Sequence, residues 1–214
     1  MLYFETMNAF YAALALVLAY LIGSFPSAYI VGKLSKGLDI RQVGSRNMGA
    51  MNTFYKVGFW WGILVLALDI GKGALAIGAS IWLGAHLYVH MGAGVAAVIG
   101  HNLPVFLKFK GGKGGATCIG ILAVLLPWGI PVYIGLFLIL MALTRFPTLS
   151  YSLAFLGYPF VGAFLHHSIA LAVYSIILIL LPGARYIGRI REMYRKAGGS
   201  WKHVLMMTSL KDRL

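Results

Sequence analysis

Residues 107–127 have the sequence LKFKGGKGGATCIGILAVLLP, in which a loop rich in lysine and glycine passes directly into an apolar run that ends at Pro127. The apolar run, about residues 115–126, would be only about 18 Å long as a helix, because each helical residue rises about 1.5 Å. The hydrocarbon core of a bilayer is about 30 Å thick. We therefore expect a tilted or partial membrane helix that begins at a cationic glycine loop.

The rest of the chain supports a membrane location. The 214 residues are 60% hydrophobic and 11% charged, whereas soluble domains are roughly 45–50% apolar and about 25% charged. Six further apolar segments are long enough to span, at about 9–32, 57–84, 88–106, 128–144, 148–165 and 168–183. The sequence predicts an all-α integral membrane protein with about seven transmembrane segments. We expect one domain over residues 1–214, with a basic cytoplasmic tail from about residue 184.

The distribution of charge predicts the orientation. The chain has 18 Lys and Arg against 5 Asp and Glu, a formal net charge of +13. If the N-terminus lies outside, then 33–56, 107–114, 144–148 and the tail lie inside, and they hold every lysine and arginine except Lys72. Inner loops are enriched in these residues, so we predict an outer N-terminus and a cytoplasmic C-terminus. This rule explains the net charge without nucleic acid, and the loops lack the interleaved aromatic residues of a nucleic-acid surface.

Three inner loops carry candidate site residues. In the first, VGSRNMGAMN at 43–52, glycines permit converging backbone N–H groups, and Ser45, Asn47 and Asn52 add polar groups. An ordinary capped turn is the alternative.

In the second loop, Lys110 and Lys113 flank Gly111 and Gly112, and Gly114 to Thr117 opens the short helix. A helix N-terminus with flanking lysines favours phosphate. Lysines that only touch lipid head groups are the alternative, but such contact needs no double glycine. The loop is not a Walker A motif, because Lys113 is followed by glycine.

The third loop, TRFPTLS at 144–150, offers Arg145 and Thr148. Arginine binds phosphate in a bidentate manner, or its side chain extends to the membrane surface. Within the helices, His101 is either a packing residue or a catalyst. Asp69 and Lys72, three residues apart on one face, form either a structural ion pair or one that supports a site.

The sequence lacks the residue patterns of several common catalytic and metal sites. The carboxylates Glu5, Asp39, Asp69, Glu192 and Asp212 form no close pair on the inner loops, which argues against a two-metal site. No HxxxxD or GxSxG motif occurs, and Cys118 is the single cysteine. We therefore expect no metal and no organic cofactor.

The signatures resemble a known family. GHNLPVFLKFKGGKGGAT at 100–117 is similar to the second signature of the bacterial acyl-phosphate-dependent glycerol-3-phosphate acyltransferases, the PlsY family, and 44–52 is similar to the first. LIGSFPSAYIVGKL, LDIGKG and TRFPTLS resemble other conserved stretches of that family, so that the resemblance spans about residues 14–190.

The resemblance implies seven helices in the bacterial inner membrane and a role in phospholipid biosynthesis. The family moves a fatty acyl group from acyl phosphate to the 1-hydroxyl of glycerol 3-phosphate, which gives lysophosphatidate and phosphate. Both substrates are phosphorylated, and the acyl chain would lie between helices within reach of membrane lipids. The residues expected to take part in catalysis are Lys113, Ser45, Arg145 and His101. Those expected to bind substrate phosphate are Lys110, Gly111, Gly112, Gly114, Thr117, Asn47, Asn52 and Thr148.

The chain departs from the family pattern at several positions. Arg46, Met51, Gly115 and Pro147 differ, and in the last signature, GARYIGRI at 183–190, Gly183 replaces a histidine and Tyr186 an asparagine. Loss of these two side chains bears on which acceptor the protein uses. The alternative function is a non-catalytic or transporting membrane protein that binds a phosphorylated small molecule or lipid.

Overall fold

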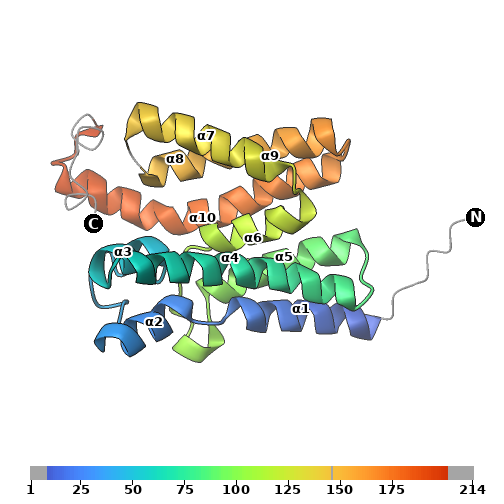
Figure 1. The fold of residues 1–214 in the computed structure, drawn as a ribbon, viewed down its shortest axis with the longest axis horizontal. Helices are drawn as coiled ribbons and strands as arrows, with labels where there is room; N and C mark the ends of the chain where they lie inside the picture. The colour runs from blue at the N-terminus through green and yellow to red at the C-terminus, as the bar shows by residue number, and fades with distance from the viewer. Residues whose placement is uncertain (1–8, 146, 202–214) are drawn as a thin grey trace, which may run out of the picture.

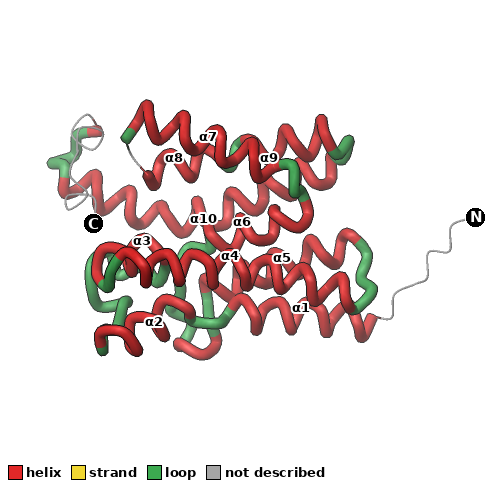
Figure 2. Tube along the Cα trace, in the orientation of Figure 1, coloured by secondary structure: helices red, strands yellow, loops and turns green. Residues whose placement is uncertain are grey.

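A computed structural model describes residues 9–145 and 147–201. Throughout this part of the chain the regular structure is helical (Figure 2). The elements are α1 Ala9–Gly23, α2 Ser27–Lys36, α3 Ala50–Lys56, α4 Phe59–Trp82, α5 Leu87–Asn102, η1 Val105–Leu107, α6 Gly115–Leu125, α7 Gly129–Thr144, α8 Pro147–Ala154, α9 Gly157–Phe160, η2 Val161–Leu165 and α10 Ile169–Lys196.

The helices run roughly side by side in a bundle (Figure 1). One half contains α1 to α5, with α1 packed against α4 and α5, and α3 packed against α4. The other half contains α7 to α10. The short α6 lies between them, because it packs against α4 on one side and contacts α10 and α7 on the other.

Within the described residues, four helical segments are long and apolar enough to cross a membrane. They are Ala9–Lys36, Phe59–Trp82, Leu87–Leu107 and Ile169–Lys196. Three shorter apolar helical segments are Gly115–Leu125, Gly129–Thr144 and Leu149–Leu165. Each of the seven overlaps one of the apolar segments predicted from the sequence.

The connections fall into two groups at opposite ends of the bundle (Figure 2). The loop after α2 and the break between α7 and α8 lie toward one end, and the loop before α6 lies in the same half of the view. The connections 83–86, 126–128 and 166–168 lie at the other end. The loops predicted to lie inside thus share one half of the bundle, and the loops predicted to lie outside share the other end.

Two glycines let α4 and α6 come into backbone contact. A Cβ atom on Gly73 would collide with the carbonyl of Thr117, and one on Gly120 would collide with the carbonyl of Ile70. Small residues at such crossings let helix backbones approach closely, which is a main source of packing energy inside a membrane. The crossing fixes the position of α6 and therefore of the glycine loop that precedes it.

The first predicted span is interrupted at Pro26. Proline has no N–H and disfavours helical geometry in the residue before it, so α1 ends and α2 begins at Ser27. Lys72 Nζ donates to the carbonyl oxygen of Phe25 over 3.1 Å, and Ser27 Oγ donates to Asp69 Oδ1 over 2.8 Å. Lys72 Nζ and Asp69 Oδ1 are 2.9 Å apart, with both side chains buried.

The Asp69–Lys72 pair therefore supplies partners for polar groups at the helix break. Such groups have no water to bond to at membrane depth. Of the two alternatives left by the sequence, these contacts favour a structural ion pair.

The last helix, α10, is longer than the predicted span. It has 28 residues and a length of about 42 Å, and it continues beyond residue 184 into the basic segment. It also runs through Pro182, whose missing N–H cannot bond to the carbonyl of Leu178, four residues earlier. Cys118 Sγ donates to that carbonyl oxygen over 3.4 Å. The single cysteine thus supplies a substitute donor from α6.

Candidate functional site: three loops beside α6

Gly111 and Gly112 are packed against His101. A Cβ atom on Gly111 would collide with the His101 carbonyl, and one on Gly112 would collide with its imidazole ring. The backbone N–H of Gly112 donates to the His101 carbonyl oxygen over 3.1 Å. Close packing therefore accounts for the double glycine between the two lysines, and the Gly112 N–H has a partner inside the protein.

Gly114 starts α6 in a conformation that favours glycine. Its φ is +90°, in the region that L-amino acids with a side chain rarely adopt. The turn directs the first N–H groups of α6 toward the loop, and these groups have no acceptor within the helix itself. Together with the helix dipole they make this helix end favourable for an anion.

The His101 side chain is buried and lies beside two other elements. Its Nδ1 is 3.4 Å from Thr117 Oγ1 on α6 and 3.7 Å from Asp69 Oδ1 on α4. His101 is 4% exposed and Thr117 is fully buried. This position favours the packing alternative for His101, because the ring ties the glycine loop to α4 and α6.

The first loop is organised around the Asn52 amide. Its Nδ2 lies 3.0 Å from three carbonyl oxygens, those of Ile40, Val43 and Asn47. Its Oδ1 accepts from the Ser45 N–H over 3.1 Å. The side chain is 1% exposed, so these contacts fix the backbone and leave Ser45 and Asn47 half-buried at the loop surface.

The first and second loops meet at Gly112. The carbonyl oxygen of Met48 lies on the side of Gly112 where a side chain would be, and Met48 itself is 2% exposed. The first loop therefore touches the lysine–glycine loop at Met48, the residue that follows Asn47.

The third predicted segment approaches the start of α6 through α8. Tyr151 Cε2 is 3.6 Å from the position of a Cβ atom on Gly115, and Thr144 Oγ1 is 2.9 Å from Ser150 Oγ. Arg145 ends α7 in a left-handed conformation, φ +51°, and is exposed. Thr148 is a residue of α8, and its side chain lies outside the part of the chain that the structure describes.

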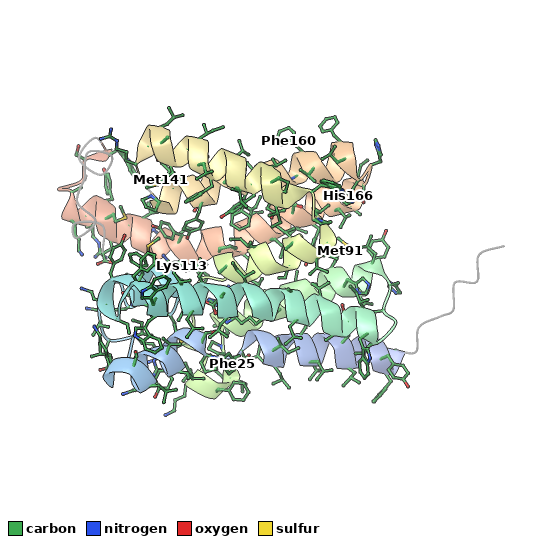
Figure 3. All side chains as sticks on the ribbon, viewed as in Figure 1. Phe25, Met91, Lys113, Met141, Phe160 and His166 are labelled. Carbon is green, nitrogen blue, oxygen red and sulfur yellow. The ribbon has the colours of Figure 1, made fainter. Side chains whose placement is uncertain are left out.

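The last helix adds two contacts that sequence reasoning did not predict. Lys113 Nζ lies 3.6 Å from the centroid of the Tyr186 ring, and Arg185 Nη2 donates to the carbonyl oxygen of Asn102 over 3.2 Å. Figure 3 shows Lys113 beside the C-terminal half of α10. Tyr186 stood out in the sequence only as a departure from the last signature, and its partner lies far away along the chain.

The ion pairs leave the loop strongly cationic. Asp39 and Glu192 each pair with a nearby cation, Arg41 and Lys196 respectively. Lys108 and Lys110 are exposed, whereas Lys113 is half-buried. The described residues include no group of three or more His, Cys, Asp or Glu that could hold a metal ion.

Asp39 and Arg41 form an ion pair in the segment between α2 and the first loop. Asp39 Oδ1 accepts from the Nε of Arg41 over 3.0 Å, and Oδ2 accepts from Nη2 over 2.8 Å. These hydrogen bonds lower the pKa of Asp39 below its usual value. The Asp39 carboxylate thus pairs with Arg41 and does not neutralise the lysines of the second loop.

The fold and the site together define a helical membrane protein with a cationic, glycine-lined site at one end of its bundle. A family model described as "Glycerol-3-phosphate acyltransferase" matches residues 13–196, and the chain belongs to this family.

Curated relatives agree with the family model. The chain is 54% identical over 202 residues to "Glycerol-3-phosphate acyltransferase 2" of Dehalococcoides mccartyi strain 195, which covers 94% of this chain and 96% of the relative. It is 43% identical over 185 residues to "Glycerol-3-phosphate acyltransferase" of Bacillus subtilis, which covers 86% of this chain and 94% of that protein.

Solved structures have the same fold. The glycerol 3-phosphate form of PlsY (YgiH), an integral membrane glycerol 3-phosphate acyltransferase, superposes with a TM-score of 0.78 at 30% identity, covering 88% of this chain and 94% of that one. Its lysophosphatidic acid form gives 0.76 at 28% identity, covering 92% and 99%. The resemblance inferred from the signatures is confirmed.

Proposed function

We propose that this family member transfers a fatty acyl group from acyl phosphate to the 1-hydroxyl of sn-glycerol 3-phosphate, in the synthesis of phospholipids. The products are lysophosphatidate and inorganic phosphate. Family membership over residues 13–196 supports an enzyme rather than a non-catalytic or transporting protein that binds phosphorylated ligands.

The chemistry requires little from a protein base. The hydroxyl oxygen of glycerol 3-phosphate forms a bond to the acyl carbonyl carbon, and the bond from that carbon to the phosphate oxygen breaks. The hydroxyl proton passes to a phosphate oxygen of the substrates. Since an acyl phosphate is already activated, positioning the two substrates and stabilising the developing charge can supply the catalysis.

The observation that carries this proposal is the half-buried Lys113 at the glycine-capped start of α6. Its ammonium would bind the phosphate of glycerol 3-phosphate. Together with the N–H groups of the helix end, it would also stabilise the charge that develops on the departing phosphate. Lys110 and Arg145, which are exposed, would bind the outer phosphate oxygens. Ser45, Asn47 and Thr148 would complete the polar lining, together with the backbone of Gly111 and Gly114.

The buried members of the predicted site would act through the loops. Asn52 would hold the first loop in shape, and His101 with Thr117 would hold the second. Gly112 would serve by letting the loop lie on the His101 ring. These roles follow from side chains whose polar atoms already lie next to protein partners.

The proposal places the site at the cytoplasmic face of the bacterial inner membrane. All seven apolar segments would cross or enter the bilayer as one domain, with the N-terminus outside and the C-terminus inside. The two groups of loops at opposite ends (Figure 2) and the lysine and arginine bias support this arrangement. The acyl chain of the donor would then lie between helices, within reach of membrane lipids, while its phosphate reaches the loops.

Phosphate release by purified full-length protein with palmitoyl phosphate and glycerol 3-phosphate tests the proposal. We expect turnover that requires both substrates, and a loss of at least about 100-fold in Lys113→Ala, because charge-stabilising groups typically contribute this much. Lys36→Ala is the matched control, since Lys36 is an exposed lysine outside the three loops. A well-folded wild-type protein without turnover would contradict the proposed function.

A further inference from the structure

Tyr186 contacts the lysine on which the proposed function depends. The sequence places tyrosine here where the resembling family has asparagine, and the structure places its ring against the Lys113 ammonium, with Nζ 3.6 Å from the centroid. The replacement therefore lies inside the site. It does not simply remove a polar contact.

An aromatic face affects a lysine differently from a carboxylate. The ring quadrupole attracts the ammonium and fixes its direction, most effectively where water is partly excluded. Lys113 and Tyr186 are both half-buried, so this condition is met. Unlike a carboxylate, the neutral ring does not itself cancel the positive charge of Lys113.

A second contact from the preceding residue holds α10 over the loop. Arg185 Nη2 bonds to the carbonyl oxygen of Asn102, the last residue of α5. The Asn102 side chain is buried and its Oδ1 is close to the position of a Cβ atom on Gly114, at 3.1 Å. Arg185 thus ties α10 to the segment that supports the glycine loop, and Tyr186 follows it directly onto Lys113.

We propose that Tyr186 is a positioning residue for substrate phosphate: its ring holds the Lys113 ammonium in the orientation that binds the phosphate group of the acceptor. This inference rests on the proposed function, because it concerns the same site.

Substitutions at Tyr186 separate the ring from the hydroxyl and from general packing. Tyr186→Leu removes the ring, and we expect the KM for glycerol 3-phosphate to rise about tenfold with a smaller change in kcat. Tyr186→Phe keeps the ring, so we expect a KM within about twofold of wild type. The unfolding temperature in detergent should be similar in all three proteins.

A series of fluorinated phenylalanines tests the electrostatic cause at nearly constant shape. Each ring fluorine weakens the negative face of the ring, so KM should rise stepwise from none to three fluorines. This series also covers the case in which Tyr186→Leu fails to fold. Equal KM values across the fluorinated series, or a Tyr186→Phe protein as impaired as Tyr186→Leu, would overturn the inference.

The two proposals fail in different ways. A wild-type protein that releases no phosphate from palmitoyl phosphate contradicts the proposed function. An active wild-type protein whose KM is insensitive to the ring at position 186 keeps the proposed function and removes Tyr186 from the site.

Discussion

His101 explains the glycines of the second loop better than phosphate binding alone does. Its carbonyl and ring occupy the places where side chains on Gly111 and Gly112 would be. Contact with His101 therefore fixes the backbone between the two lysines, Lys110 and Lys113. The glycines are thus explained by packing against His101, and the lysines by the proposed phosphate site. The half-buried position of Lys113 depends on the close packing of the glycines.

Gly112→Ala should remove activity for a steric reason. The added methyl group would collide with the His101 ring and the Met48 carbonyl. The loop must therefore shift, as in other substitutions that overpack a well-packed core. Phosphate release should fall at least tenfold. Gly115→Ala is the control, since its Cβ would make only an ordinary contact of 3.6 Å with Tyr151. Equal activity of the two variants would show that the packing of Gly112 is unimportant.

Asn52 and Asn47 should differ although both were predicted to bind phosphate. Asn52→Ala leaves the Ser45 N–H and three carbonyl groups without this partner, and a buried polar group left unpaired costs about 1–3 kcal/mol. We expect a clear fall in the unfolding temperature in detergent. Asn47→Ala should leave that temperature unchanged and raise the KM for glycerol 3-phosphate. The reverse pattern would assign the scaffold role to Asn47.

Among the elements, the α4–α6 crossing decides where the site can form. Gly73 contacts the backbone of α6, whereas Gly71, two residues earlier on the same helix, is exposed with no atom near its Cβ position. Gly73→Ala should destabilise the protein by about 1–3 kcal/mol through overpacking. Gly71→Ala should be neutral or slightly stabilising, because alanine favours helix over glycine. Thermal unfolding of the purified variants measures both, and equal stability would argue against backbone contact at this crossing.

Hydropathy predicted the seven apolar segments because each is a continuous run of apolar residues in the sequence. The interruption at Pro26 was not predicted, since it depends on Lys72 and Asp69 of another helix to satisfy the freed polar groups. The same holds for α10, which continues through Pro182 with help from Cys118. The Lys113–Tyr186 contact also joins distant segments. Local patterns indicated which residues were unusual, and tertiary packing decided what each one contacts.

At the scale of the whole molecule, the bundle separates its loops by chemistry. The half of the bundle that holds the glycine loop also holds the C-terminal part of α10 (Figure 1), so cations from distant segments gather in one part of the molecule. The opposite end holds the short connections, such as 83–86. Under the proposed function, a phosphorylated, water-soluble acceptor would approach from this cationic part. This makes the orientation in the membrane a functional property that can be measured.

Cysteine labelling should assign the two ends to the two sides of the membrane. The only native cysteine, Cys118, is fully buried, so the wild-type chain should react poorly and serve as the background. His86→Cys places an exposed thiol at the end with short connections, and Lys36→Cys places one at the end with the site. In spheroplasts, a membrane-impermeant maleimide should label His86→Cys at once and Lys36→Cys only after permeabilisation, because lysine-rich loops remain in the cytoplasm. Immediate labelling of Lys36→Cys with protection of His86→Cys would reverse the orientation and place the proposed site on the wrong side for a cytoplasmic acceptor.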